Sequence, residues 1–171
     1  MASILHIAVG LVGGRWAAGG PSLRAQLGFV ALSMLPDADV IAFALGIPYE
    51  ASFGHRGASH SLCFALLMGL VVGLVARLAR GAWLRLGCLT VLVVASHPIL
   101  DAMTTGGLGV ALLWPWSDAR IFFDWRPIPV APIGPAFFSL KGLQVALAEL
   151  GPSLPLIIYA LWPRRPDPAG T

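Results

Sequence analysis

The sequence predicts an all-α fold: a polytopic membrane helix bundle of about five hydrophobic segments with a long irregular interfacial loop. Three observations predict this fold. Hydrophobic residues make up 57% of the 171-residue chain and charged residues only 11%, against roughly 25% charged residues in soluble domains. The apolar residues form long runs, and the arginines gather at the ends of these runs. We therefore expect a lipid bilayer as partner and no nucleic acid, since the net charge of +3 forms no basic patch.

Five hydrophobic segments follow one another along the chain. No basic residue precedes the first, so we expect a retained helix rather than a cleaved signal. Pro36 interrupts the second segment, where it removes a backbone hydrogen bond and favours a kink. Several segments are at or below the ~20 residues that cross a bilayer, so tilted or incompletely spanning helices are expected. The predicted segments are Ser3–Ala18, Leu23–Gly46, Ser61–Ala76, Leu84–Leu100 and Gly142–Trp162.

The connections between these segments differ in character. Residues 48–59 form a polar loop, and residues 103–141 are rich in Gly, Pro and Trp, which predicts irregular structure partly in the interface. Cys63 and Cys88 lie in separate apolar runs and are expected to pack rather than to form a disulfide. We expect a single membrane-embedded helical domain over residues 1–165 and a short disordered tail over residues 166–171.

The basic residues alternate between two sides of the predicted bundle. Seven fall on one side and four on the other, which favours the first side as the cytoplasmic one. His6, the loop around His55 and His60, and the helix end that carries His97 then share the outer side. The larger set is Arg15, Arg24, Arg77, Arg80, Arg85, Arg164 and Arg165, and the smaller set is Arg56, Arg120, Arg126 and Lys141.

His97 and Asp101 are the first candidates for chemistry. They lie four residues apart, which places them on one face of a helix about one turn from each other. This spacing suits two ligands of one metal ion, and the alternative is a His–Asp hydrogen bond inside a helix bundle. Pro98 disfavours helical geometry at the residue before it, so we expect the helix to bend or restart there.

Asp37 and Asp39 lie in the motif Leu35-Pro36-Asp37-Ala38-Asp39. A carboxylate inside a membrane costs a few kcal/mol unless it is paired or liganded. Two residues apart on a regular helix, the aspartates would face different sides, but the break at Pro36 lets both point at one site. The alternative is that the segment ends at Leu35 and the aspartates cap the next helix from water.

His55 and His60 belong to the polar motif His55-Arg56-Gly57-Ala58-Ser59-His60-Ser61. Ser59 is expected to cap the third segment and thereby to place His60 in its first turn. The guanidinium of Arg56 matches phosphate oxygens, and its alternatives are to neutralise the aspartates or to meet lipid headgroups. His6 is a lone histidine on an apolar helix, so it is either packing or, by its place on the shared side, a further ligand.

All four histidines and three aspartates can thus meet at one metal centre. They exceed the four ligands of a tetrahedral zinc ion, so either two ions bind or some residues support the ligands. Mixed imidazole and carboxylate ligation favours zinc, manganese or iron over magnesium or calcium. The chain contains no His-Glu-x-x-His motif, no Walker phosphate loop and no Gly-x-Ser-x-Gly elbow. The predicted metal set is His6, Asp37, Asp39, His55, His60, His97 and Asp101.

These three motifs, followed by Leu112-Leu113-Trp114-Pro115, resemble the YdjM/YbcI family of bacterial inner-membrane proteins. The likeness runs from about His6 to Trp116, with the motifs in order. That family is described as membrane-bound metal-dependent hydrolases and is grouped with the all-α fold of zinc-dependent phospholipase C and P1 nuclease. The resemblance implies the same seven residues as metal ligands and a hydrolytic activity.

The expected function is a metal-dependent hydrolase of a phosphoester, most simply a lipid or lipid-linked headgroup at the outer membrane–water boundary. One or two divalent transition metal ions, zinc first and manganese or iron as alternatives, would activate water and polarise the phosphoryl group. Arg56 would hold the phosphate, and one of the three carboxylates would act as base. A divalent-metal transporter and a non-catalytic protein with a structural metal stay open, although no internal repeat of the kind found in transporters is visible. The carboxylates considered as base are Asp37, Asp39 and Asp101.

Overall fold

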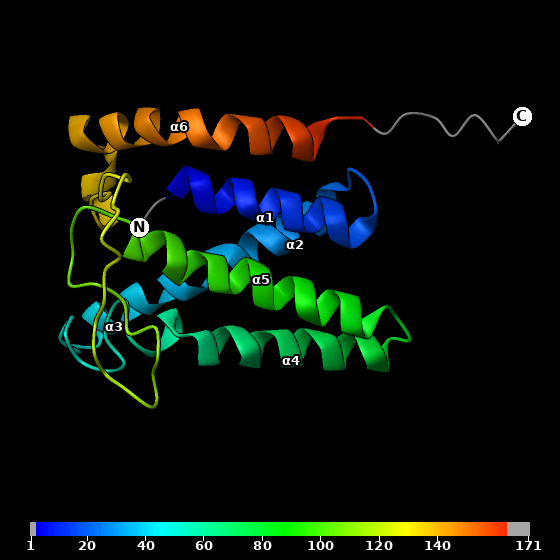
Figure 1. Ribbon diagram of the computed structural model, residues 1–171, viewed down its shortest axis with the longest axis horizontal. Helices are drawn as coiled ribbons and strands as arrows, with labels where there is room; N and C mark the ends of the chain where they lie inside the picture. The colour runs from blue at the N-terminus through cyan, green and yellow to red at the C-terminus, as the bar shows by residue number, and fades with distance from the viewer. Residues whose placement is uncertain (1–2, 164–171) are drawn as a thin grey trace, which may run out of the picture.

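The computed structural model describes residues 3–163 and shows within that range a bundle of helices without a β-strand (Figure 1). The α-helices are α1 (Ser3–Ala18), α2 (Leu23–Met34), α3 (Ile41–Ala44), α4 (Leu62–Leu78), α5 (Trp83–Ala102) and α6 (Leu140–Leu161). The 3₁₀ turns are η1 (Leu35–Val40), η2 (Ala58–His60) and η3 (Gly134–Phe138). Because α2, η1 and α3 form one continuous span, the bundle has five helical segments and the predicted all-α architecture is confirmed.

Three of these segments are long and apolar enough to cross a bilayer, namely Leu23–Ala44, α5 and α6. Helices α1 and α4 are also apolar but shorter, with 16 and 17 residues. On α4, Leu66, Leu70 and Leu74 recur every fourth residue and are all more than half exposed. Contact with lipid rather than water explains such an apolar outer face.

Helix α1 lies at the centre of the bundle and packs against α2, α5 and α6, while α4 packs along α5 (Figure 1). Gly10 allows the close approach of α1 to α2, since a Cβ there would lie 2.6 Å from Val30 Cα. One turn earlier, the buried hydroxyl of Ser33 on α2 donates to the carbonyl oxygen of His6, 2.8 Å away. The packing of these two helices therefore fixes where His6 lies.

Polar contacts attach the middle and the C-terminal end of α6 to the rest of the bundle. The buried carboxylate of Glu149, in the middle of α6, accepts from the backbone N–H of Ile4 at 2.8 Å, at the start of α1. Near the C-terminal end of α6, Gln26 donates to the carbonyl oxygen of Ala160 at 2.9 Å. An acidic side chain at the N-terminus of a helix is favoured by the helix dipole, so Glu149 stabilises α1 as well as anchoring α6.

One local prediction was wrong, and one of the two alternatives at Pro98 is excluded. Ser61, not Ser59, caps α4, because its hydroxyl accepts from the backbone N–H of Phe64 at 3.0 Å. His60 consequently lies in the 3₁₀ turn before α4 instead of in the first turn of the helix. At Pro98 the expected restart does not occur, since α5 continues to Ala102, and the alternative of a bend there stays a prediction. Pro98 removes only one backbone hydrogen bond near the end of a helix that packs on three neighbours.

The long connection between α5 and α6 is irregular, as predicted. It contains η3 and two isolated bridges, Thr104 with Ile128 and Val110 with Ile121, and it covers the end of the bundle beside α3 (Figure 1). Cys63 and Cys88 are free thiols; Cys63 is partly buried, whereas Cys88 is exposed, so the predicted packing is not found at Cys88. The predicted single domain of residues 1–165 stays a prediction, and the predicted tail of residues 166–171 lies outside the described residues.

The two ends of the bundle differ in charge. The turns α1–α2 and α4–α5 lie at one end, and the loop of residues 48–59 and the long connection lie at the other (Figure 1). We call the first the basic end, because it carries Arg15, Arg24, Arg77, Arg80 and Arg85. We call the second the loop end. The positive-inside rule predicts that the basic end faces the cytoplasm.

Labelling of single thiols in intact cells tests this orientation. In a background where Cys63 and Cys88 are replaced by alanine, Glu50→Cys at the loop end should react with a membrane-impermeant maleimide. Ala82→Cys, which is also exposed but lies in the α4–α5 turn, should react only after the cells are opened. The reverse pattern would place the loop end in the cytoplasm.

Candidate metal centre

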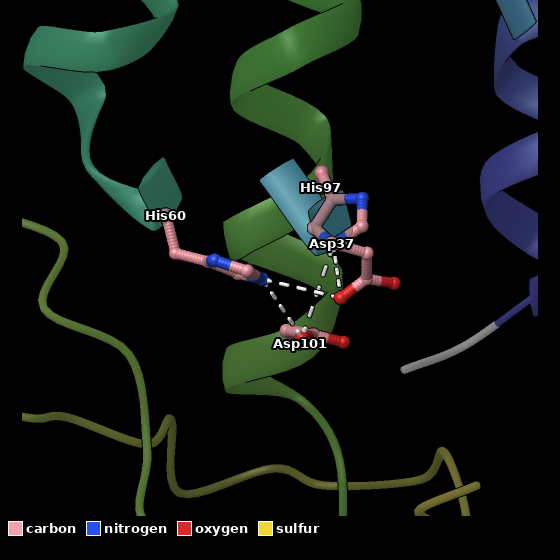
Figure 2. A group of neighbouring side chains, drawn as sticks. All are labelled: Asp37, His60, His97 and Asp101. Carbon is pink, nitrogen blue, oxygen red and sulfur yellow. Dashed lines mark ion pairs between the residues drawn. The ribbon is translucent and has the colours of Figure 1, made fainter. Parts of the chain in front are cut away.

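Four buried side chains meet at the loop end of the bundle (Figure 2). Asp37 comes from η1, His60 from η2, and His97 and Asp101 from α5. One ligand atom from each lies within 4.8 Å of the others. Asp37 is 6% exposed and the other three residues are fully buried. Segments far apart in the sequence thus place two imidazoles and two carboxylates around one point, and we call these residues the four-donor group.

The Nε2 atoms of the two imidazoles lie between carboxylate oxygens (Figure 2). Asp37 Oδ1 is 3.5 Å from His60 Nε2 and 3.4 Å from His97 Nε2. Asp101 Oδ2 is 3.5 Å and 4.0 Å from the same two nitrogens. These separations exceed the roughly 2.7–3.2 Å of an N–H···O hydrogen bond. They are close to the about 3.4 Å that separates two ligands bound at about 2.0–2.1 Å to a tetrahedral zinc ion, so the donors fit a divalent metal.

The second ring nitrogen of each imidazole is held by an oxygen. His97 Nδ1 lies 2.7 Å from the backbone carbonyl oxygen of Ser33, which can only accept a hydrogen bond. His60 Nδ1 lies 3.0 Å from Asp39 Oδ2, and an ionised carboxylate likewise only accepts. We therefore assign the proton of the neutral ring to Nδ1 in both histidines, which leaves the Nε2 lone pair facing the four-donor group. Metal-ligating histidines are typically oriented in this way.

The charge of His60 depends on its carboxylate neighbours. These are Asp101, Asp37 and Asp39. Burial by itself lowers the pKa of His60, but the three carboxylates outweigh it and raise this pKa to about 10. Without a metal, His60 is therefore a cation at neutral pH. A divalent ion that binds its Nε2 atom displaces this proton and takes over the neutralisation of the carboxylates.

Asp39 lies next to the four-donor group and contacts the polar loop. Its Oδ1 is 2.6 Å from His55 Nδ1, and its Oδ2 accepts the backbone N–H of Arg56 at 3.0 Å and the hydroxyl of Ser59. Asp39, His55 and His60 form a second close group that shares His60 with the first. The two aspartates of the Pro36 motif thus lie on opposite nitrogens of His60 and otherwise have different partners, and Asp39 orients the loop histidines.

His6 borders the four-donor group without belonging to it. Its ring meets the ring of His97 edge to face, with centroids 3.8 Å apart, and its Nε2 is 3.9 Å from Asp101 Oδ1. The side chain is fully buried, and among residues 3–163 neither ring nitrogen makes a hydrogen bond. His6 is therefore placed to join the ligands of a bound ion or to accept a proton beside them.

Arg56 connects the two groups of residues. Its backbone N–H donates to Asp39, and its side-chain Nε lies 3.0 Å from Asp101 Oδ2. The guanidinium is only 1% exposed, and its Nη1 donates to the carbonyl oxygen of Gly106 at 3.0 Å. Arg56 has a φ of +61°, a conformation that a residue with a side chain rarely adopts. Of the roles considered from the sequence, neutralising an aspartate is the one that these contacts show.

Arg120 supports the site but was not predicted from the sequence to do so. Its two terminal nitrogens donate to the carbonyl oxygens of His55 at 2.9 Å, Tyr49 at 3.0 Å and Ala51 at 2.9 Å. These bonds hold the loop that carries His55 and Arg56. An isolated arginine in an irregular connection, 65 residues after His55, has no local signal that reveals this function.

Comparisons with known proteins agree with a membrane location. The sequence matches the YdjM inner membrane protein family over residues 1–164. It is 43% identical over 146 residues to the inner membrane protein YbcI of Escherichia coli (strain K12), which covers 80% of this chain and 82% of that protein. No solved structure matches the chain. The chain therefore belongs to the YdjM family of inner membrane proteins.

Proposed function

We propose that this protein is a metal-dependent hydrolase of phosphoesters that acts on a lipid or lipid-linked headgroup at the outer boundary of the inner membrane. The observation that supports this proposal is the four-donor group, in which two imidazoles with assigned tautomers and two carboxylates are buried together. A divalent ion, zinc in the first place, would supply activation of water and polarisation of a phosphoryl oxygen. Phospholipid headgroups are the phosphoesters nearest to a site at this end of the bundle.

The surrounding residues have separate roles in this proposal. Asp37, His60, His97 and Asp101 would hold the ion, and Asp39 would keep His60 in the required tautomer. Asp37 Oδ2 is buried and makes no hydrogen bond among residues 3–163, so this oxygen is the one we assign as proton acceptor. Arg56, held by Asp101, would bring positive charge to the phosphate that reacts.

A structural metal centre is the second candidate function, and one observation favours it. The donors are at most 6% exposed, and structural metal sites are closed whereas catalytic sites keep a position open to water or substrate. A divalent-metal transporter has less support, because the donors gather at one end of the bundle instead of near the midplane. Hydrolysis by the metal-loaded protein separates the first two candidates.

The test uses the protein purified in mild detergent with its metal and a panel of phosphomonoesters and phosphodiesters. We expect hydrolysis that a chelator abolishes. Arg56→Ala should keep the metal, because this residue is no ligand, and should reduce the rate at least about tenfold, since it removes charge that stabilises the transition state. Arg126→Ala removes the same charge from the loop end and should leave the rate unchanged. Bound metal without hydrolysis of any ester by the wild type would favour the structural centre.

A further inference from the structure

A pocket of about 270 Å³ adjoins the four-donor group through Arg56. Its lining comes from three parts of the chain: Tyr49 and Arg56 from the polar loop, Gly107 and Pro132 from the long connection, and Lys141 from the first turn of α6. None of the four donors lines it. Because Arg56 Nε lies 3.0 Å from Asp101, the pocket is separated from the four-donor group by a single side chain.

The lining of this pocket is positively charged. It includes Arg56 and Lys141 but no carboxylate. Lys141 stands near the N-terminus of α6, where the helix dipole is positive and a cation is unfavourable. Asp101 offsets the charge of Arg56, whereas Lys141 has no carboxylate partner within residues 3–163, so an anion bound in the pocket would neutralise this second cation.

Arg56 has an unused donor group. Its Nε is paired with Asp101 and its Nη1 with Gly106, but Nη2 is buried and makes no hydrogen bond within the described part of the chain. A buried guanidinium nitrogen without an acceptor is costly. Nη2 itself has no surface open to the pocket, but Arg56 lines the pocket and contributes positive charge there, and guanidinium groups match the spacing of phosphate oxygens.

Gly107 keeps the guanidinium of Arg56 and the hydroxyl of Tyr49 close together. A Cβ at this position would lie 2.7 Å from Arg56 Nη1 and 3.0 Å from Tyr49 Oη. The φ of Gly107 is +94°, a conformation that suits glycine. A neutral hydroxyl donor thus lies beside the arginine at the same pocket.

We infer that this pocket binds a phosphate group, with Arg56, Lys141 and Tyr49 as its donors. This inference rests on the proposed function, because the bound phosphate would be the phosphate group of the phosphoester substrate. The shared chemistry is a phosphate with at least one negative charge, and it can come from a lipid headgroup or from free phosphate. The position next to Arg56 brings this phosphate within one side chain of Asp101.

Calorimetric titration of the purified, metal-loaded protein tests the pocket with two probes, inorganic phosphate and dihexanoyl phosphatidic acid. Dihexanoyl phosphatidylcholine, which has no net charge, serves as the comparison ligand. We expect Lys141→Ala to weaken binding of the anionic probes about tenfold, the usual effect of one lost charge-assisted contact. Lys141→Arg should restore binding, and Arg126→Ala, which removes a loop-end charge outside this pocket, should bind like the wild type.

Lys141 is exposed, so its substitution is not expected to unfold the protein. Because a metal ion can itself bind phosphate, the titrations are repeated after chelation, where the dependence on Lys141 should persist. Tighter binding of phosphatidic acid than of phosphate would identify a lipid headgroup as the source, and equal binding would identify free phosphate.

Equal affinities of Lys141→Ala and the wild type, or binding of phosphatidylcholine as tight as that of phosphatidic acid, would overturn the inference. Binding that depends on Lys141 together with no hydrolysis would keep the pocket and reject the proposed hydrolase. Hydrolysis together with phosphate binding that does not depend on Lys141 would keep the proposed hydrolase and reject the pocket.

Discussion

Replacing His97 by alanine should remove most of the divalent metal that copurifies with the protein in mild detergent, and Asp101→Ala should do the same. Each change takes one donor from a set of four and leaves an incomplete, charge-imbalanced site. We expect affinity to fall more than the roughly 10–100-fold typical of losing a residue that only orients a ligand. Elemental analysis of the purified variants, followed by competition with a fluorescent chelator, measures both content and affinity.

Two further variants calibrate this result. Thr90→Ala alters another buried polar residue of α5, whose hydroxyl donates to the carbonyl oxygen of Leu86 in the same helix, and it should keep the wild-type metal content. Asp39→Asn weakens the contact to His60 Nδ1 and should lower affinity by about 10–100-fold. Stoichiometric metal in both His97→Ala and Asp101→Ala would show that this pair is only structural.

Removing the metal with a chelator should lower the thermal midpoint of the wild-type protein clearly. Asp37 and Asp101 bring negative charge into a buried site, and a bound divalent ion offsets their desolvation. A ligand at about 1,000 times its Kd stabilises the native state by about 4.1 kcal/mol, and metal affinity is in this sense part of the folding free energy. Thermal unfolding followed by circular dichroism, with and without chelator, measures the difference.

In the double variant Asp37→Asn/Asp39→Asn the same chelator should have little effect, because the ion is weakly held and the charge repulsion is gone. The metal-free double variant should melt at or above the metal-free wild type. The contacts of the two aspartates also predict a division between single variants. Asp37→Asn should behave like the double variant, since Asp37 is in the four-donor group, and Asp39→Asn should retain part of the chelator effect. Equal chelator effects in the wild type and the double variant would exclude both aspartates from metal binding.

The sequence by itself determined the environment of this protein and, to within about two residues, the limits of its helices. A composition of 57% hydrophobic and 11% charged residues cannot cover a water-soluble surface, so a membrane bundle followed directly. The end of α1 at Ala18 and the break of the second segment at Pro36 were predicted, because glycine and proline act through local backbone geometry. The sequence also collected seven histidines and aspartates into one candidate set, since polar residues are conspicuous in an apolar chain.

Only the tertiary structure showed which of these seven residues belong to the four-donor group and which lie beside it. Asp37 and Asp39 look equivalent in the sequence, yet η1 turns Asp37 toward His60 and His97 and Asp39 toward His55. The direction of a side chain in an irregular turn depends on partners from distant segments, which no local periodicity encodes.

The same reason applies to the arginines. The fold buries Arg56 against Asp101, 45 positions further along the chain. The sequence motif around Arg56 is equally compatible with a solvent-exposed arginine that binds phosphate. Arg120 donates to the carbonyl oxygens of His55 and Tyr49, and the carbonyl oxygen of Ser33 lies beside His97. The partners in these contacts are 64–71 residues apart in sequence. Such contacts form because buried donors and acceptors must find partners when helices pack, and which partners are near is decided by the packing.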